Sequence, residues 1–173
     1  MLKTLTFKQL IIINFMLCSL WHVLCFLACI FIKESRFSPD RLRYKIQKWE
    51  KGGKWYVKYL RIKDWKDLLP QYIMQKGFSK QHFTNLKIEY IDRFLMETCR
   101  AEWDHSMNCM YAVISIIINP LGIGLLFAFL SIFVNLPFIA IQRYNRTRLL
   151  TVKKKVQRSR RNIPIPPGNT ENA

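Results

Sequence analysis

The chain has 173 residues, which is enough for one compact domain. Half of its residues are apolar, yet 28 lysines and arginines stand against only 11 aspartates and glutamates, for a formal net charge of +17. In a soluble domain this excess would suggest nucleic-acid binding. Here the charges are missing from two long apolar blocks, which favours an integral membrane protein over a soluble basic domain.

The first apolar block runs from Gln9 to Ile32 and has no charged residue apart from the normally neutral His22. About 20 apolar residues cross a bilayer core as a helix, so residues 10–32 predict one span within an N-terminal segment 1–32. The apolar run is longer than that of a usual signal peptide, and Phe26 fits a lipoprotein cleavage site poorly. We therefore favour a retained transmembrane helix over a cleaved leader.

The segment 33–105 is predicted to lie at the cytoplasmic surface of the membrane. Within it, residues 44–69 alternate aromatic and basic side chains and include Trp65 and Lys66. Such a stretch can form a groove for single-stranded nucleic acid. Next to a span, however, Trp and Tyr settle among lipid headgroups and Lys and Arg meet anionic lipid. We interpret the stretch as interfacial, with no nucleic-acid partner, and 70–77 as a loop.

Residues 83–105 are predicted to form one helix that enters the membrane. One face repeats at intervals of three and four residues, through Ile88, Ile91, Leu95, Thr98, Glu102 and His105. A second face alternates in sign, as a ladder of ion pairs would, along Arg93, Glu97, Arg100 and Asp104.

The second apolar block, residues 106–142, has no charge over 37 residues, or roughly 55 Å as a helix. That length exceeds one span, and Asn119-Pro120-Leu121-Gly122 near its middle is a good turn. We expect a transmembrane helical hairpin with arms at 103–119 and 121–141. A re-entrant pair that does not reach the far side is the alternative.

The C-terminal segment 143–173 is predicted to be a basic cytoplasmic tail, disordered and in contact with lipid along 153–161. Lysines and arginines number two before the first span, 17 in 33–108 and nine from Gln142 onward. The positive-inside rule therefore places the N-terminus outside and both the central segment and the C-terminus in the cytoplasm. The expected fold is all-α: a multi-pass protein of the cell membrane with about three spans and a cytoplasmic interfacial segment.

Two groups of polar residues flank the predicted hairpin. Glu102 and His105 lie one turn apart, where a carboxylate could orient an imidazole to act as a general base; an interfacial histidine bound to headgroups is the alternative. After the hairpin, Arg143, Asn145 and Arg146 could clamp a phosphate or an oxyanion, or serve only as the basic flank of a span. The five cysteines show no metal-binding spacing, and we expect no metal site.

Three blocks between 42 and 149 carry a family resemblance: 55–70, then Glu97-Thr98-Cys99-Arg100-Ala101-Glu102-Trp103-Asp104-His105, and last Gln142-Arg143-Tyr144-Asn145-Arg146-Thr147-Arg148-Leu149. In these blocks the chain resembles the glycosyl-4,4'-diaponeurosporenoate acyltransferases of bacterial carotenoid synthesis. His82 also falls where the family pattern has a histidine, fifteen residues before Glu97. The chain departs from that pattern at Asp64 and at Gln71-Tyr72.

The resemblance implies a membrane acyltransferase that esterifies a fatty acyl group onto a sugar hydroxyl of a glycosylated carotenoid acid or a related glycolipid. We expect His105, Glu102 or His82 to act in catalysis. Substrate-binding candidates are Arg100, Arg143, Asn145, Arg146, Trp65 and Lys66. The donor would come from the cytoplasm as acyl-CoA or acyl carrier protein, without a bound cofactor. The alternative is a non-catalytic scaffold for other pigment-synthesis enzymes.

Overall fold

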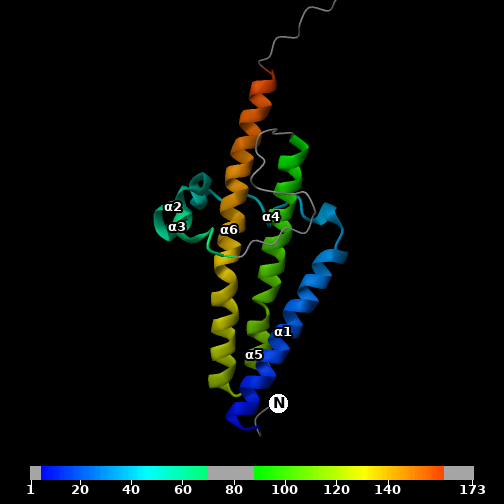
Figure 1. Ribbon diagram of the computed structural model, residues 1–173, viewed down its shortest axis with the longest axis vertical. Helices are drawn as coiled ribbons and strands as arrows, with labels where there is room; N and C mark the ends of the chain where they lie inside the picture. Colours follow the sequence, from blue (N-terminus) through cyan, green and yellow to red (C-terminus); the bar gives the residue numbers. More distant parts are fainter. Residues whose placement is uncertain (1–4, 70–87, 162–173) are drawn as a thin grey trace, which may run out of the picture.

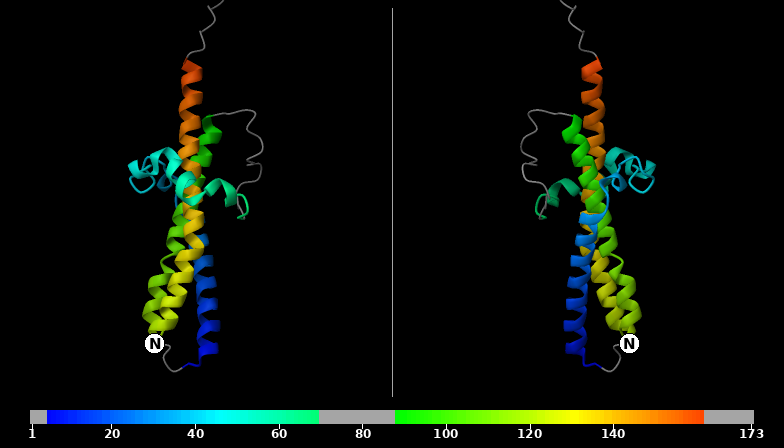
Figure 2. Two further views of the ribbon diagram at one scale, coloured as in Figure 1. Left: turned by 90° about the vertical axis from the view of Figure 1, so that its left-hand side faces the viewer. Right: turned by 90° about the vertical axis from the view of Figure 1, so that its right-hand side faces the viewer.

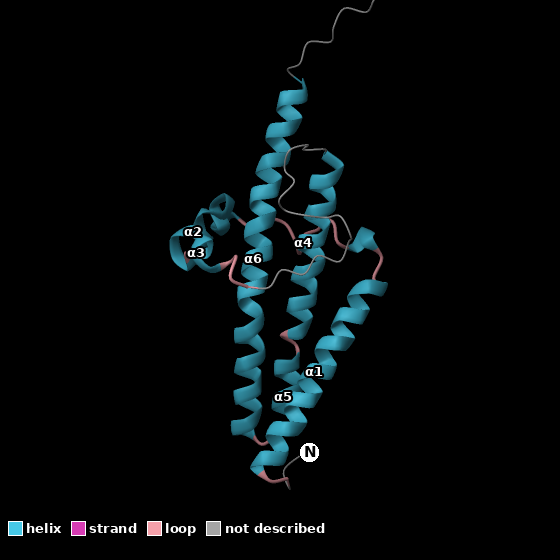
Figure 3. Cartoon of the chain, in the orientation of Figure 1, coloured by secondary structure: helices cyan, strands magenta, loops and turns pink. Residues whose placement is uncertain are grey.

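The computed structural model describes residues 5–69 and 88–161, and every regular element within these ranges is a helix (Figure 3). Four helices build the long body: α1 (Phe7–Phe31), α4 (Ile88–Asn108), α5 (Tyr111–Ile118) and α6 (Leu121–Arg161). Four short helices connect α1 to the side of this body: η1 (Glu34–Arg36), η2 (Lys48–Gly53), α2 (Lys54–Leu60) and α3 (Ile62–Trp65). The predicted all-α class is therefore confirmed for the described residues.

Helix α1 begins and ends at positions that its sequence marks. At its start, the Thr6 hydroxyl accepts a hydrogen bond from the Gln9 amide at 3.5 Å, and the Gln9 side chain accepts one from the Thr6 amide at 3.0 Å. This capping box satisfies amide groups that the first helical turn leaves free. At its end, Ile32 adopts an extended conformation directly before Lys33, where the charged sequence resumes.

One end of the molecule consists of apolar helices whose large side chains face outward. There α1, α5 and the first half of α6 lie side by side (Figures 1 and 2). Phe15 on α1 is 69% exposed and Phe133 on α6 is 62% exposed. Within the described ranges, two helices are long and apolar enough to cross a membrane, α1 and the part of α6 from Leu121 to Arg158. Apolar surface of this extent suits lipid contact and agrees with the predicted membrane protein.

The predicted hairpin forms, but its first arm differs from the prediction. Helix α5 ends at Ile118 and α6 begins at Leu121, so the turn lies where Asn119 and Pro120 placed it. The expected arm 103–119 is divided between the end of α4 and the eight residues of α5, with a break at 109–110. The second arm is confirmed as a candidate span, whereas the first arm does not qualify as one helix by itself.

The expectation of a disordered basic tail along 153–161 is wrong, because α6 continues to Arg161. Leu149 packs with Ile91 and Leu95 of α4, and Val152 and Val156 extend the same contact. Lys153 adds an ion pair with Asp92 at 2.5 Å. The basic composition of the segment hid these apolar residues, whose spacing of three and four fits one helix face.

A buried amide pair joins α1 to the hairpin turn at the N-terminal end of the molecule. Asn14 donates to the Asn119 side-chain oxygen at 2.7 Å, and Asn119 donates back to the Asn14 side-chain oxygen at 2.8 Å. The Tyr111 hydroxyl donates to the Asn14 carbonyl at 3.0 Å. Polar groups in an apolar environment must find partners, so these bonds fix the position of α1 against the turn.

Gly124 controls how closely α5 can approach α6. A methyl group at this position would lie 3.0 Å from the Ile116 Cα and from the Ser115 carbonyl oxygen, whereas a methyl group at Gly122 would meet nothing within 4 Å. We expect Gly124→Ala to lower the free energy of unfolding by about 1–3 kcal/mol through overpacking. Thermal unfolding in detergent checks this, with Gly122→Ala as the matched control. Equal stability of the two variants would contradict the close packing.

Candidate functional site

A buried group of charges lies where the segment after α1 crosses α4 and α6. Glu102 on α4 accepts a hydrogen bond from Arg143 of α6 at 2.9 Å, and its second oxygen lies 2.5 Å from a guanidinium nitrogen of Arg146. Glu102 is 5% exposed and Arg146 is fully buried. Because a buried charge is costly without a partner, this carboxylate and the two guanidinium groups depend on one another.

Glu50 is the second carboxylate of the group and comes from the short helix η2. Its side chain is fully buried. It accepts hydrogen bonds from Arg143 at 2.7 Å and from the Tyr56 hydroxyl at 2.5 Å. Burial alone would raise the pKa of Glu50, but the bonds from Arg143, Tyr56 and the Gln47 amide outweigh it and hold the pKa below its usual value. Burial and the bond to Glu50 raise the pKa of Tyr56.

The arginines also bind the backbone of the segment after α1. Arg146 donates to the Tyr44 carbonyl and to the Thr98 carbonyl, both at 3.0 Å, and Arg143 donates to the Lys45 carbonyl at 3.2 Å. The predicted anion clamp of Arg143 and Arg146 is therefore filled by the chain's own carboxylates and carbonyls. The third member, Asn145, is half-buried, and its side chain forms no hydrogen bond with another described residue.

His105 lies one turn further toward the apolar end and faces α6. Its Nδ1 is 2.9 Å from the Asn135 side-chain oxygen, and its ring stacks on Phe138 with centroids 4.6 Å apart. The expected orientation of His105 by Glu102 is wrong, because the Glu102 oxygens are engaged by the two arginines. Residues three apart on one helix lie on similar but not identical faces, so they meet different α6 residues: Glu102 meets the two arginines and His105 meets Asn135.

The direction of the His105 bond can be assigned from a second bond. The Asn135 side-chain nitrogen donates to the Ser131 carbonyl at 2.9 Å. The oxygen of that amide is therefore the atom that faces His105, and it can only accept. Neutral His105 must then carry its proton on Nδ1, which leaves the lone pair on Nε2 available to accept a proton.

The remaining sequence-predicted residues lie away from this group. Arg100 pairs with Glu97 at 3.2 Å and with Glu34 at 3.5 Å, on the side of α4 that faces the end of α1. Together with the Arg93–Glu97 pair at 3.1 Å, this confirms the first three members of the predicted ion-pair ladder. The fourth member, Asp104, forms no ion pair with another described residue, so the prediction is wrong at that position.

The last three residues that the sequence predicted for the site are Trp65, Lys66 and His82. The Trp65 indole donates to the Leu60 carbonyl at 2.7 Å, and its ring packs against the core around Ile141. The Lys66 ammonium nitrogen lies 2.5 Å from a carboxylate oxygen of Asp67. His82 and the predicted loop 70–77 fall outside the described residues.

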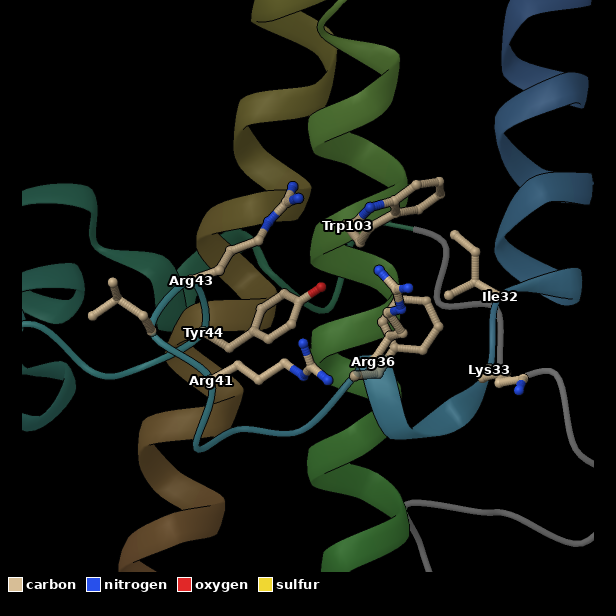
Figure 4. A pocket seen from close by; sticks show the side chains of 9 residues that line it. Ile32, Lys33, Arg36, Arg41, Arg43, Tyr44 and Trp103 are labelled. Carbon is tan, nitrogen blue, oxygen red and sulfur yellow. The ribbon is translucent and has the colours of Figure 1, made fainter.

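A hollow of about 810 Å³ adjoins the buried charges (Figure 4). Its aromatic walls are Phe37, Tyr44 and Trp103, of which Tyr44 also lies beneath the Arg146 guanidinium at 5.3 Å. Four basic and two aliphatic side chains complete the lining: Lys33, Arg36, Arg41, Arg43, Ile32 and Leu42. We call this the arginine hollow; it opens where α1 ends, at the border between the apolar and the charged parts of the molecule.

A second hollow, of about 600 Å³, lies between α2, α3 and α6 and is called the lysine hollow here. Its backbone wall, Gly52 and Gly53, has φ of 64° and 90°, which favours glycine. A methyl group on Gly53 would lie 2.5 Å from the Thr147 hydroxyl. The polar lining consists of Lys54, Lys58, Lys63, Lys66, Asp67 and Arg148.

Two of the residues that complete these arrangements were not singled out from the sequence. Glu50 is a single acidic residue within the strongly basic stretch 44–63, and Asn135 is a polar residue inside an apolar block. Each is an exception to the composition around it. Polar residues at membrane depth are functional candidates by default, so Asn135 could have been identified from its position in the apolar block.

Known proteins of one family are similar to this chain. The family model for glycosyl-4,4'-diaponeurosporenoate acyltransferase matches residues 40–155. Proteins of that name from Staphylococcus aureus strains MRSA252 and USA300 are 27% and 26% identical over 129 residues, which cover 73% of this chain and 78% of each relative. No solved structure shows significant similarity. The matched range contains Glu50, Glu102, His105, Asn135, Arg143 and Arg146.

Removal of one buried charge should lower the free energy of unfolding. We expect Glu102→Gln to destabilise the protein by about 3–5 kcal/mol, because Arg146 would be left buried without a carboxylate. The matched control is Asp64→Asn, which breaks an exposed pair with Arg61 and should change stability by about 0.5 kcal/mol or less. Denaturant unfolding in detergent measures both. A Glu102→Gln protein as stable as the control would refute the mutual dependence of these charges.

Proposed function

The chain belongs to the glycosyl-4,4'-diaponeurosporenoate acyltransferase family and is an acyltransferase, and we propose that it esterifies a fatty acyl group onto a sugar hydroxyl of a membrane glycolipid. The acceptor is a glycosylated carotenoid acid, as the names of its relatives suggest, or a related glycolipid. The observation that supports this reaction best is the His105–Asn135 pair, a base of defined tautomer at the border of the apolar helices.

In the proposed reaction, His105 Nε2 takes the proton from the sugar hydroxyl. The hydroxyl oxygen then forms a bond to the carbonyl carbon of an acyl thioester. The bond from that carbon to sulfur breaks, and the thiolate leaves with the proton that the imidazolium returns. The products are an O-acyl sugar and a free thiol, so the proton and the electron pairs balance.

Asn135 and the buried charges have supporting roles in this proposal. Asn135 keeps the proton of the neutral ring on Nδ1, much as the third member of a catalytic triad orients a histidine. Glu102 and Arg146 join the segment after α1 to α4 and α6, and this segment supplies most of the arginine hollow. They are positioning residues and do not touch the reacting atoms.

We further propose three spans, formed by α1, by the end of α4 together with α5, and by the first half of α6. Several observations support this topology. The start of α1 and the turn between α5 and α6 lie at the same end of the molecule (Figure 1), and Asn14 binds Asn119 there. The basic segments gather at the other end, which the positive-inside rule assigns to the cytoplasm.

The base is tested by mass spectrometry of glycolipids from cells that express each variant. His105→Ala should abolish the added acyl mass, and Asn135→Leu should reduce it by about 10–100-fold, because the unfixed imidazole loses its orientation. The control His22→Ala removes a histidine whose Nδ1 lies 2.8 Å from the Cys18 carbonyl of its own helix, and it should retain activity.

Three results would contradict the assignment. Full product with His105→Ala would exclude His105 as the base, and loss with His82→Ala instead would transfer the role to His82. An unchanged lipidome after deletion of the gene in its native host would favour a scaffold without catalytic activity.

The topology is tested with single cysteines in a background that lacks the five native ones. Leu121→Cys, at the exposed first position of α6 next to the turn, should react with a membrane-impermeant maleimide in intact cells, whereas Lys154→Cys should react only after lysis. A Leu121→Cys residue that is protected until lysis would favour a re-entrant pair over a full hairpin.

A further inference from the structure

The cations around α4 and α6 differ in whether a carboxylate neutralises them. Arg93, Arg100, Arg143, Arg146 and Lys153 each form an ion pair with a carboxylate. The cations of the arginine hollow form no ion pair with any carboxylate among the described residues. Arg41 donates to the Ser35 carbonyl at 3.3 Å, and Arg43 lies over the Tyr44 ring at 5.7 Å. This concentration of uncompensated charge requires an anionic ligand or solvent.

The lining of the hollow points to the kind of anion. Among the described residues, no acidic side chain lines it, although four basic ones do. Figure 4 shows Arg36, Arg41 and Arg43 disposed around Tyr44 and Trp103, on a segment and a helix that are far apart in sequence. Guanidinium groups bind phosphate with paired donors, and aromatic side chains stack on nucleobases. The volume also lies within the range of small-molecule sites.

We propose that the arginine hollow binds the phosphorylated nucleotide of the acyl donor, a thioester of the coenzyme A class. This inference rests on the proposed acyl transfer and specifies its donor. A lipid phosphodiester carries a single charge and no base, so it would use neither the four cations nor the aromatic walls fully. Coenzyme A carries a diphosphate, a third phosphate and an adenine, which match both features.

The hollow and the buried charges share a wall. Tyr44 presents its ring to the hollow and its carbonyl to Arg146, while the Arg43 carbonyl accepts from Arg143 at 3.5 Å. The Glu102 carboxylate that holds both arginines precedes Trp103 directly on α4. The buried pairs therefore set the position of the nucleotide site without binding the nucleotide themselves.

Binding of coenzyme A to the full chain in phosphatidylcholine nanodiscs tests the proposal. We expect saturable binding that weakens about tenfold or more in Arg36→Gln/Arg43→Gln, since each lost charged contact to phosphate is worth roughly one such factor. The matched control, Lys154→Gln/Lys155→Gln, removes the same charge from exposed positions of α6 and should bind within about twofold of wild type. Removing the 3'-phosphate from coenzyme A should also weaken binding. Arg41→Gln repeats the test if the double variant fails to insert.

Several results would overturn the proposal. They are absence of saturable binding to wild type, equal binding by the arginine variants, and loss confined to Lys58→Gln/Lys63→Gln in the lysine hollow. Full competition by phosphatidylglycerol, with no effect of the 3'-phosphate, would assign the arginines to lipid headgroups instead.

A parallel assay of glycolipid acylation separates this inference from the proposed function. Acylation by acyl carrier protein without coenzyme A binding refutes only the donor. Coenzyme A binding without any acylated glycolipid leaves the donor site standing and refutes the acceptor reaction.

Discussion

The fold depends on a constraint imposed by burial: the carboxylates of Glu50 and Glu102 and the guanidinium group of Arg146 are removed from water together with most of the Arg143 side chain. None of these charges is tolerable alone in that position, because desolvation costs several kcal/mol for an ion without a partner. Three parts of the chain supply them, η2, α4 and α6. Correct assembly of these parts is therefore the condition for burying any one of them, and the irregular segment between α1 and α2 acquires a defined path over the helices.

The helices were predictable where neighbouring residues alone determine them. The two apolar blocks gave α1 and the turn at Asn119, since length, hydropathy and turn residues act over short stretches. The buried stripe through Ile91, Leu95, Thr98 and Glu102 was also visible in its spacing. The continuation of α6 to Arg161 was not, because its support comes from Ile91, Leu95 and Asp92 on another helix. Charge density alone suggested disorder where tertiary contacts maintain a helix.

The candidate site was predictable in composition but not in its pairings. Glu102, His105, Arg143 and Arg146 were recognised, yet their order in the sequence suggested that neighbours on one helix bind each other. In the structure, each finds its partner across helices, and Asn135 and Glu50 complete the sets. Each residue turns an α-helix by about 100°, so a small change in how α4 packs against α6 changes which α6 side chain a given α4 residue contacts. This packing cannot be read from the order of residues in the sequence. Arginines that looked free to hold a ligand are thereby engaged within the protein, whereas the cations of the arginine hollow form no ion pair with a described carboxylate.

The length of α6 has one further consequence. Its 41 residues correspond to roughly 60 Å, about twice the thickness of a bilayer core. Asn135, which engages His105, and Arg143, which engages Glu50 and Glu102, lie eight residues apart on it, or roughly 12 Å along the helix axis. Because both residues belong to one continuous helix, the distance along its axis between the partner of His105 and the partner of the two carboxylates is set by helix geometry. It does not vary with the conformation of a loop.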